Sequence, residues 1–300
     1  MTRIAAVIVN YGRRAEMIGV LKSLTRSVVR AAPVFTVNYG VPDSALEEQR
    51  AACPDVEAVL LSKNPGYAAG NNLGIAAALH SGADWVLILN DDVEFDAACL
   101  GKLCEAGESD PRIGVVGPRV YHFDQPNVIQ SGGGWIDASW RTGHIAQNVR
   151  GDGVPCVRTD VDWLSGCMLM VRRATIEQAG ALDERFFLYW EEVEWCRRIV
   201  GEGWRIVHEP AARAWHRGVS VNYRPRPFVS YYMTRNRLLL LTLRRAPLRA
   251  WLAAWTEFLR TQASGLLRRR APVHRRMALR GMLDFVCGRF GPLTHEAEDA

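Results

Sequence analysis

Short apolar runs alternate with longer, helix-like stretches through the first third of the chain. The runs are rich in β-branched residues and end in polar or Gly-rich turns, which is the pattern of β-α-β units. We therefore predict an α/β fold with a mostly parallel sheet flanked by helices. The predicted strands cover residues 4–9, 34–37, 56–61 and 85–89, and the predicted helices cover residues 15–29 and 70–81. Ligands of such sheets bind at the carboxyl ends of the strands, so the turns there are the first places to look for chemistry.

The remainder of the chain has two different patterns. Residues 114–221 mix shorter elements, with strands predicted at 115–120, 168–171 and 205–208, a helix at 191–201 and a Gly-rich loop at 131–135. From Pro225 onward the pattern is helical, over residues 228–244, 247–270 and 274–289. The second of these helices is basic and amphipathic, which fits packing on the core and contact with a membrane equally well. Its apolar face holds Trp251, Trp255, Phe258, Leu259 and Leu266, opposite Glu257, Arg260, Ser264 and Arg268.

Charge divides the chain after Val221. The 300 residues are 48% hydrophobic, enough for a sizeable core, and the formal net charge is +5. Residues 1–221 carry 22 basic and 27 acidic side chains, whereas residues 222–300 carry 15 Arg and 5 acidic side chains. We predict a catalytic α/β domain over residues 1–221 and a basic helical region over residues 222–300. A net charge of +10 on the second region favours an anionic partner.

The cysteines and apolar segments indicate a cytoplasmic protein. Seven cysteines, an odd number without C-x-x-C pairs, favour free thiols over a disulfide framework or structural zinc. The first apolar run is too short for a signal peptide. The longest apolar run of the basic region, residues 238–243, is far shorter than the ~20 residues of a spanning helix. We expect a cytoplasmic location, with at most peripheral contact with the inner face of a membrane.

Two acidic segments are candidates for chemistry. Asn90, Asp91 and Asp92 follow an apolar strand, and adjacent carboxylates there favour a hard divalent cation bridging a diphosphate, although an Asp-rich turn capping the strand is an alternative. Residues 183–195 place an aromatic run before three acids, and an apolar wall raises a carboxylate's pKa and makes it a better base. The same acids would also suit a solvated helix start.

Two further segments have the composition of ligand sites. Residues 64–75 form a Gly- and Asn-rich turn entering a helix, where backbone N–H groups are free to bind phosphate or hydroxyl oxygens. This turn lacks the G-x-G-x-x-G and Walker patterns, which argues against a dinucleotide-dependent dehydrogenase and a P-loop nucleotidase. His216 follows Trp215, and a histidine in that setting is more often structural than a ligand.

Six blocks together resemble the nucleotide-sugar-dependent glycosyltransferases of family 2, and most closely their bacterial rhamnosyltransferase-like branch. The resemblance spans about residues 4–245, and the order and spacing of the blocks make it more specific than any single block. It implies a GT-A-type fold, a nucleotide diphospho-sugar donor, a divalent metal (Mg²⁺ or Mn²⁺) and inverting transfer. The blocks are VIVNYG, NPGYAAGNNLGI, LNDDV, DWLSGCMLMVRR, DERFFLYWEEVEW and WHRG.

The resemblance also assigns roles to residues. Asp92 and His216 are expected to hold the metal, and Glu192 is expected to be the catalytic base, with Glu191 as the second choice because the family usually has Glu-Asp there. Relatives place an Asp where this chain has Asn38, which puts the base preference in question. Arg172 and Arg173 match the segment between donor and acceptor. The expected nucleotide-sugar-binding residues are Val9, Asn10, Tyr11, Asn38, Asn64, Gly66, Gly70, Asn71, Asn90, Asp91, Trp163 and Gly166.

The predicted function is transfer of a sugar, with rhamnose as the first expectation, from a dTDP-, UDP- or GDP-linked donor to a hydroxyl of a glycan or glycolipid. The basic helices are then expected to contact an anionic acceptor or inner-leaflet lipid. Nucleic acid is not an expected partner, because the basic region matches no known nucleic-acid-binding module. The alternatives are nucleotidyl transfer onto a sugar phosphate and a non-catalytic scaffold that binds nucleotide sugars.

Overall fold

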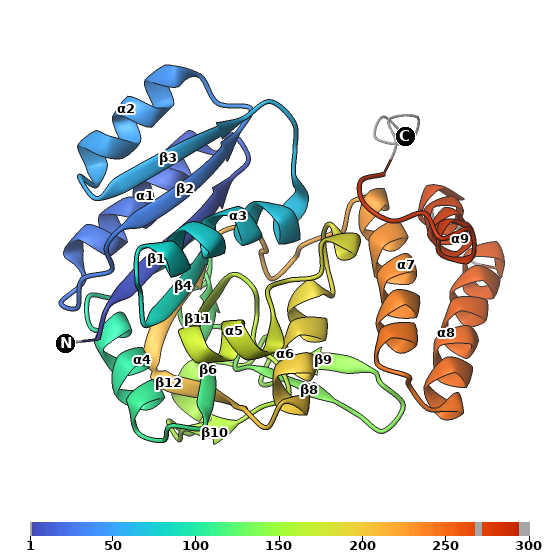
Figure 1. Cartoon of the computed structure of the whole chain (residues 1–300). Helices are drawn as coiled ribbons and strands as arrows, with labels where there is room; N and C mark the ends of the chain where they lie inside the picture. Colours follow the sequence, from blue (N-terminus) through green and yellow to red (C-terminus); the bar gives the residue numbers. More distant parts are fainter. Residues whose placement is uncertain (1, 268–271, 294–300) are drawn as a thin grey trace.

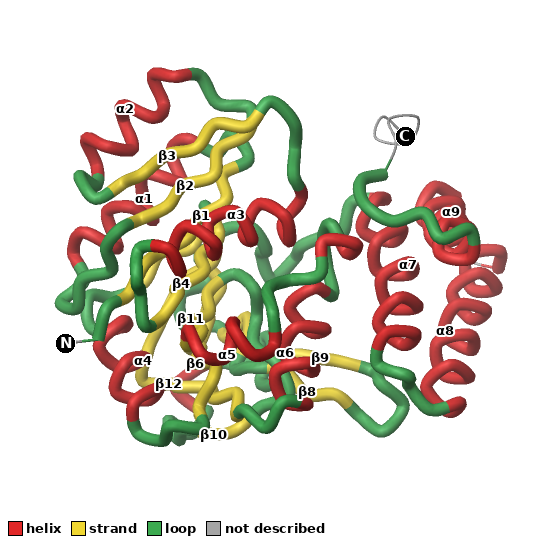
Figure 2. Tube along the Cα trace, viewed as in Figure 1, coloured by secondary structure: helices red, strands yellow, loops and turns green. Residues whose placement is uncertain are grey.

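The computed structural model describes residues 2–267 and 272–293, and its centre is a mixed sheet (Figures 1 and 2). The strand order is β10-β12-β6-β11-β4-β1-β2-β3, with β5 paired to β12 and β7 to β6, while β8 and β9 form a separate hairpin. The strands are β1 (Ile4–Asn10), β2 (Val34–Tyr39), β3 (Val56–Leu61), β4 (Trp85–Asn90), β5 (Val93–Phe95), β6 (Ile113–His122), β7 (Ile129–Ser131), β8 (Gly134–Ile136), β9 (Thr142–His144), β10 (Thr159–Asp160), β11 (Met168–Arg172) and β12 (Arg205–His216).

Helices cover both faces of this sheet. One apolar cluster packs beneath α1 and α4, and a second packs beneath α3, α5 and α6 on the other face (Figure 1). The helices are α1 (Arg14–Arg26), α2 (Asp43–Ala52), α3 (Gly66–His80), α4 (Cys99–Glu108), α5 (Arg173–Ala179), α6 (Glu191–Gly201), α7 (Pro227–Leu243), α8 (Leu248–Leu267) and α9 (Pro272–Val286). The short 3₁₀ turns η1 (Gly151–Gly153) and η2 (Glu184–Phe186) complete the elements. The predicted α/β class with a mostly parallel sheet is therefore confirmed.

The central strands have the composition that burial on both faces requires. All seven residues of β1 are buried, as are the first five of β4, and both strands are continuous apolar runs rather than alternating ones. β1 pairs in parallel with β2 and β4, whereas β11 runs antiparallel between β4 and β6. The carboxyl ends of β1 and β4 consequently meet at one edge of the sheet, with Val9 beside Asn90.

Strand β12 is much longer than the predicted strand at residues 205–208. The strand continues past Glu209 and Pro210 through a β-bulge, because the pairing with β6 slips between Glu209 and Arg213 and then resumes as far as His216. Proline cannot donate to a ladder and is tolerated at such irregularities. The continued pairing positions His216, whose partner in β6 is His122.

Helix α3 begins at Gly66, four residues before the predicted start at residue 70. Its glycines permit close packing, since a Cβ at Gly70 would lie 2.9 Å from a Val9 methyl and one at Gly74 would lie 2.2 Å from a Val7 methyl. Part of the segment predicted to be a Gly- and Asn-rich turn is therefore the surface by which α3 packs against β1.

Helices α7, α8 and α9 form a group beside the sheet (Figure 1). The apolar face predicted for α8 is partly packed within the protein, since the Trp251 ring lies 6.3 Å from that of Phe285 in α9. Residues 268–271, where the predicted helix was expected to end, lie outside the described residues, as does Arg268 of its polar face. Within the described part of the chain, no helix combines the length and apolarity needed to cross a bilayer.

Candidate active site

A cavity of about 610 Å³ opens at the carboxyl ends of β1 and β4. Eight residues predicted from the sequence to bind donor or metal line it, namely Val9, Tyr11, Asn64, Gly66, Asn90, Asp91, Asp92 and His216. Residues 187–189 and a segment after β12 that includes Tyr223, Arg226 and Phe228 complete the wall. The fold thus brings together turns from five separate parts of the sequence.

Asp91 and Asp92 lie in the turn between β4 and β5 and are both buried. Burial and the neighbouring Asp92 raise the pKa of Asp91 to about 6, although its carboxylate accepts a hydrogen bond from the backbone N–H of Tyr11 at 3.1 Å. Burial also opposes ionisation of Asp92, but His216 and Arg13 outweigh it and hold the pKa of Asp92 below its usual value. Asp92 is therefore the more acidic of the two carboxyls.

Arg13 is a functional candidate that the sequence analysis missed. It lines the cavity, donates to the carboxylate of Asp92, and lies 3.7 Å from that of Asp91. Its side chain is 49% exposed, so it can exchange one anionic partner for another. The sequence feature that could have indicated this role is a basic residue directly after the turn that follows β1.

His216 is oriented by a hydrogen bond on the side facing away from Asp92. Its Nδ1 lies 3.1 Å from Gln130 Oε1, an acceptor, so Nδ1 donates to Gln130 and Nε2 is directed toward Asp92. Nε2 lies 3.1 Å from Asp92 Oδ1 and 3.4 Å from the Asn90 amide nitrogen. The carboxylate oxygen and the ring nitrogen thus face each other, which is favourable when a cation or proton lies between them.

These side chains are suited to bind a divalent cation whose remaining ligands come from a substrate. No group of three or more His, Cys, Asp and Glu side chains in residues 2–267 and 272–293 is arranged to hold a metal by itself. Mg²⁺ characteristically takes one or two carboxylates together with substrate phosphates. Asp92 and His216 provide such a partial set, and a donor diphosphate would supply the remaining oxygens.

Asn10 and Asn38 are predicted binding residues that the structure places in a buried polar network. Asn38 Oδ1 accepts from Asn10 Nδ2 at 3.0 Å and from Gln49 Nε2 at 2.7 Å, while its Nδ2 donates to Thr36. Asn10 Oδ1 accepts from the backbone N–H groups of Gly12 and Arg13. Both amides therefore support the turn that presents Tyr11 and Arg13, and neither lines the cavity.

The start of α3 joins the cavity to the acidic segment. A Cβ at Gly66 would lie 2.4 Å from the Phe187 ring, and the Tyr67 N–H donates to Phe187 O at 2.7 Å. Gly66 is therefore required for packing against the residues before α6. Gly70 and Asn71 are buried within α3, away from the cavity lining, and Asn71 donates to Tyr67 O at 2.9 Å.

Gly166 and Trp163 support this region from β11's side. The hydroxyl of Tyr67 donates to Gly166 O at 2.5 Å, and a Cβ at Gly166 would meet that hydroxyl at 2.8 Å and Glu192 Cβ at 3.6 Å. Trp163 is 4% exposed and packs in the core beneath α6.

The expectation that Arg172 lies between donor and acceptor is wrong, because its guanidinium lies over Trp85 and donates to Gly107 O at the opposite end of β4.

The acidic segment adopts an unusual backbone. Phe187, Tyr189 and Trp190 have φ values of 63°, 68° and 75°, in the left-handed region that side chains with a Cβ rarely adopt. The chain enters α6 directly afterwards, at Glu191 and Glu192. Such conformations persist only where surrounding contacts hold them, and they concentrate at functional sites.

Helix α7 supplies those contacts. The Asn236 amide donates 2.8 Å hydrogen bonds to the backbone oxygens of Phe186, Leu188 and Tyr189, and the Arg235 guanidinium donates to Phe186 O at 2.9 Å. Both side chains are fully buried. Asn236 lies nearly fifty positions beyond the residues it holds, and an isolated Arg-Asn pair in a helix gives no sequence signal of this role.

Burial dominates the chemistry of Glu191 and Glu192. Neither forms an ion pair with a described residue, and burial raises the pKa of each carboxyl, with the charge of Glu192 adding to the effect on Glu191. Both lie close to Tyr67, which lines the cavity. A carboxylate with a raised pKa in this position is suited to accept a proton.

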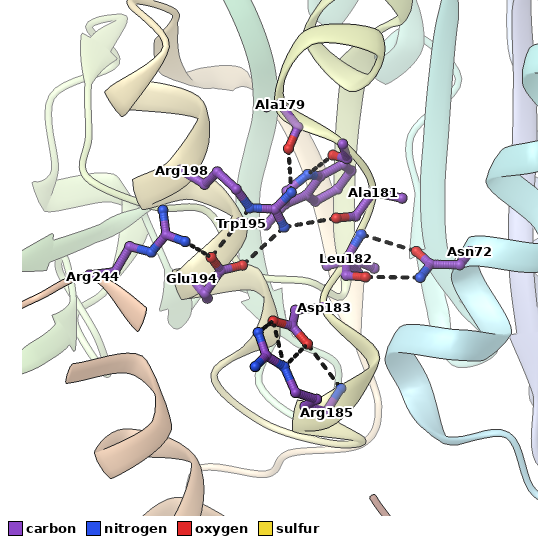
Figure 3. Close-up of polar contacts among 11 residues, drawn as sticks. Asn72, Ala179, Ala181, Leu182, Asp183, Arg185, Glu194, Trp195, Arg198 and Arg244 are labelled. Atoms are coloured by element: carbon purple, nitrogen blue, oxygen red, sulfur yellow. Dashed lines mark hydrogen bonds and ion pairs between the residues drawn. The ribbon is translucent and has the colours of Figure 1, made fainter. Parts of the chain in front are cut away.

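Glu194, the third acid of α6, has a structural role (Figure 3). Arg198 and Arg244 each approach its carboxylate to 3.0 Å, and Glu194 is 1% exposed. Arg198 also donates to Ala181 O, and Asn72 of α3 pairs with both backbone groups of Leu182. This network joins α6 to α3 and to the end of α7.

A family comparison fits this arrangement. The sequence model described as glycosyl transferase family 2 matches residues 5–177, more than half of the chain. The chain belongs to glycosyl transferase family 2. It is therefore a glycosyltransferase, as its motifs predicted.

Two curated relatives are similar over most of this family member. N-acetylglucosaminyl-diphospho-decaprenol L-rhamnosyltransferase of Mycobacterium tuberculosis is 28% identical over 240 residues, covering 72% of this chain and 76% of the relative. The dTDP-rhamnosyl transferase RfbF of Shigella flexneri is 23% identical over 266 residues, covering 82% of each chain. The predicted resemblance to rhamnosyltransferases is confirmed.

A solved structure shares the fold. The mannosyltransferase PcManGT from Pyrobaculum calidifontis, in complex with GDP-Man and Mn²⁺, superposes with a TM-score of 0.59 at 13% identity. The superposition covers 96% of this chain and 88% of the mannosyltransferase. At this identity the likeness concerns the fold alone, and it confirms the predicted GT-A-type architecture.

Proposed function

We propose that this family 2 enzyme transfers rhamnose from a dTDP-linked donor to a hydroxyl of a glycolipid, with inversion at the anomeric carbon. The observation that carries the proposal is one cavity that is lined by Asp92 beside His216 and by Tyr67, which lies close to the buried Glu191 and Glu192. The rhamnosyltransferase names of the two relatives support the sugar, and the first relative's name supports a lipid-diphosphate acceptor.

In this proposal, some residues of the site act on the leaving group and others act on the acceptor hydroxyl. Asp92 and His216 would hold Mg²⁺ or Mn²⁺, which when bound would neutralise the charge that develops on the leaving nucleoside diphosphate. Arg13 lies where its guanidinium can bind the same diphosphate. Glu192 would accept the proton of the acceptor hydroxyl as the hydroxyl oxygen attacks the anomeric carbon from the opposite face.

The donor assignment is tested with the purified chain. Thermal shifts with dTDP-, UDP- and GDP-sugars and Mn²⁺ should be largest for dTDP-rhamnose. A lipid-diphosphate-linked N-acetylglucosamine should then gain one rhamnosyl group, and NMR should show inverted anomeric configuration. Release of pyrophosphate would instead identify a nucleotidyltransferase. A failure to bind or turn over any nucleotide sugar would favour a non-catalytic scaffold.

We also propose that α8 rests on an anionic membrane surface, which places a glycolipid acceptor near the site. Leu248, Leu252, Trp255 and Leu259 recur along one side of α8 and are 73%, 59%, 41% and 61% exposed. Arg249 and Arg260, both exposed, each follow a residue of this stripe. An apolar stripe flanked by arginines is typical of interfacial helices.

Vesicle binding tests the membrane proposal. The full chain should sediment with vesicles that contain anionic lipid, and binding should weaken with salt and with the double change Leu252→Ser and Leu259→Ser. Equal binding to neutral vesicles, or none to anionic ones, would contradict it. The boundary between residues 1–221 and 222–300 stays a prediction.

A further inference from the structure

A second cavity, separate from the donor cavity, lies among α7, α8 and α9. Its volume is about 180 Å³ and its walls are mostly apolar, including Leu238, Phe258 and Met282. A cavity of about 150 Å³ is large enough to hold benzene, so this one has room for a branched five-carbon unit. Met233 and Trp255, each 41% exposed, lie at its lining and connect it with the surface.

The second cavity shares a short segment of chain with the active site. Trp190 lines it, whereas Phe187, Leu188 and Tyr189 line the donor cavity. Glu191 and Glu192 follow Trp190 directly at the start of α6. A ligand held among the three helices would therefore lie beside the residues that present the expected base.

Buried N–H groups at this cavity lack hydrogen-bond acceptors. Arg237 and Trp190 both line it, and Arg237 Nε, Arg237 Nη2 and Trp190 Nε1 are buried without an acceptor. The remaining Arg237 amine pairs with Glu257, whose side chain is 42% exposed. Unpaired buried donors are costly, and a guanidinium binds phosphate oxygens strongly. The lining is thus apolar with an incompletely satisfied cationic group.

The cavity also continues into the exposed stripe of α8. Trp255 belongs to both, since it lines the cavity and lies between Leu252 and Leu259 on the stripe. An apolar chain leaving the cavity past Trp255 would remain on apolar side chains as far as the proposed membrane surface. The partner that matches these features is amphiphilic, with an anionic group at the cavity and a long apolar tail.

We propose that this cavity binds the diphosphate and first isoprenoid units of a polyisoprenoid-diphosphate-linked acceptor. Phosphate oxygens accept hydrogen bonds from Arg237 and Trp190, the first isoprenoid unit lies against Phe258 and Met282, and the rest of the chain passes Trp255 to the membrane. The inference rests on the proposed function, because the acceptor sugar must extend from here to Glu192.

Two acceptors that differ in the lipid alone test the site during transfer. The full chain is assayed with N-acetylglucosamine diphosphate carrying either a farnesyl or a methyl group. Met233→Trp, which narrows the opening at an exposed position, should raise KM for the farnesyl acceptor by about tenfold or more, while KM for the methyl acceptor and the donor stays within about twofold. Arg237→Gln removes a group that binds the diphosphate, so it should raise KM for both acceptors and leave KM for the donor within about twofold. Val28→Trp, at a residue 81% exposed and remote from the cavity, is the matched control and should change neither KM.

Direct binding separates this inference from the proposed function. Calorimetry with farnesyl diphosphate, without added divalent cation so that the diphosphate is not drawn to Asp92, should show binding that Met233→Trp weakens and Val28→Trp leaves unchanged. Such binding without sugar transfer to either acceptor would overturn the proposed function and leave the lipid site standing. Transfer in which Met233→Trp affects both acceptors equally, or neither, would overturn the lipid site. If Arg237→Gln loses its folded circular dichroism spectrum, the exposed Met233→Trp decides the matter.

Discussion

The two pairs of adjacent carboxylates at this site have opposite surroundings. Asp91 and Asp92 end a strand beside Arg13 and His216, so Asp92 keeps its charge despite burial. Glu191 and Glu192 begin a helix and have no ion-pair partner among the described residues, so burial raises the pKa of both. The same functional group is thereby suited to cation binding in one place and to proton acceptance in the other.

The two pairs also differ in what holds them. The aspartates follow β4, which is buried and paired with β1 and β11 in the sheet. The glutamates follow a segment with three left-handed residues, which depends on Asn236 of α7. Neighbouring charges therefore set the chemistry of the first pair, whereas a remote helix sets the geometry of the second.

The largest expected effect is that of Asp92→Ala. Losing a ligand that helps to neutralise the leaving group should cost several kcal/mol of transition-state stabilisation, or about 10³-fold or more in transfer rate. Steady-state transfer and Mn²⁺ affinity by electron paramagnetic resonance should fall together. Asp124→Ala, at an exposed aspartate, is the control. Retained Mn²⁺ binding by Asp92→Ala would remove the distinction between the two pairs.

Glu192→Gln comes next and tests the proton-accepting pair. Loss of a general base typically costs about 10²–10⁴-fold in rate. Single-turnover kinetics should show this loss with donor affinity unchanged, and Glu191→Gln should lose less. If the order of the two variants is reversed, Glu191 is the base and Glu192 its neighbour.

A smaller effect is expected from Asn236→Leu, which removes the support of the second pair without touching either pair. The backbone oxygens of Leu188 and Tyr189 lose this donor, whereas Phe186 O keeps Arg235, and an unsatisfied buried group costs about 1–3 kcal/mol. Urea denaturation should show that loss, and kcat should fall with Mn²⁺ affinity unchanged. Thr242→Val, which removes a hydroxyl on the same helix that bonds Leu238 O, should leave kcat unaltered. Unchanged kcat in Asn236→Leu would show that α7 does not position the glutamates.

The smallest effect concerns stability and its dependence on pH. Burial raises the pKa of Glu191 in the folded protein, so folding favours its protonated form, and the stability that this gives is lost as the pH rises above the ordinary value of ~4.3. Glu191→Gln carries no charge at any pH. Its free energy of unfolding should exceed that of the wild type by about 1 kcal/mol or more at pH 8, and by less at pH 5. An equal difference at both pH values would contradict the assignment of a raised pKa.

The pattern of apolar and polar residues predicted those helices and strands whose signals lie within the segment itself. The strand at 56–61 and the helix at 191–201 have the predicted bounds, because a short, mostly apolar run and an acidic helix start are signals within the segment itself. Helices α2, α4 and α5 were missed, and α2 has few buried residues to mark its pattern. The long β12 was missed because its bulge, rather than a turn, follows Glu209.

The sequence analysis named the acidic residues of the candidate site but not the residues that position them. Acidic patterns pointed to residues 90–92 and 183–195, and the resemblance to family 2 assigned roles to Asp92, His216 and Glu192. Gln130, which orients His216, and Asn236, which holds the residues before α6, are ordinary amides in ordinary surroundings of sequence. Each becomes visible where the fold brings it within 3.1 Å of its partner.

By itself, the sequence determined the α/β class, the order of the turns at the sheet edge and the separation of an acidic from a basic part of the chain. These properties follow from hydrophobic periodicity and charge, which can be read directly from the order of the residues. The tertiary structure alone decided which of the two aspartates is more acidic, which side chains of α8 are exposed, and that α7 holds the segment before Glu191. Those properties depend on burial and on contacts between residues far apart in the chain, and no local pattern encodes them.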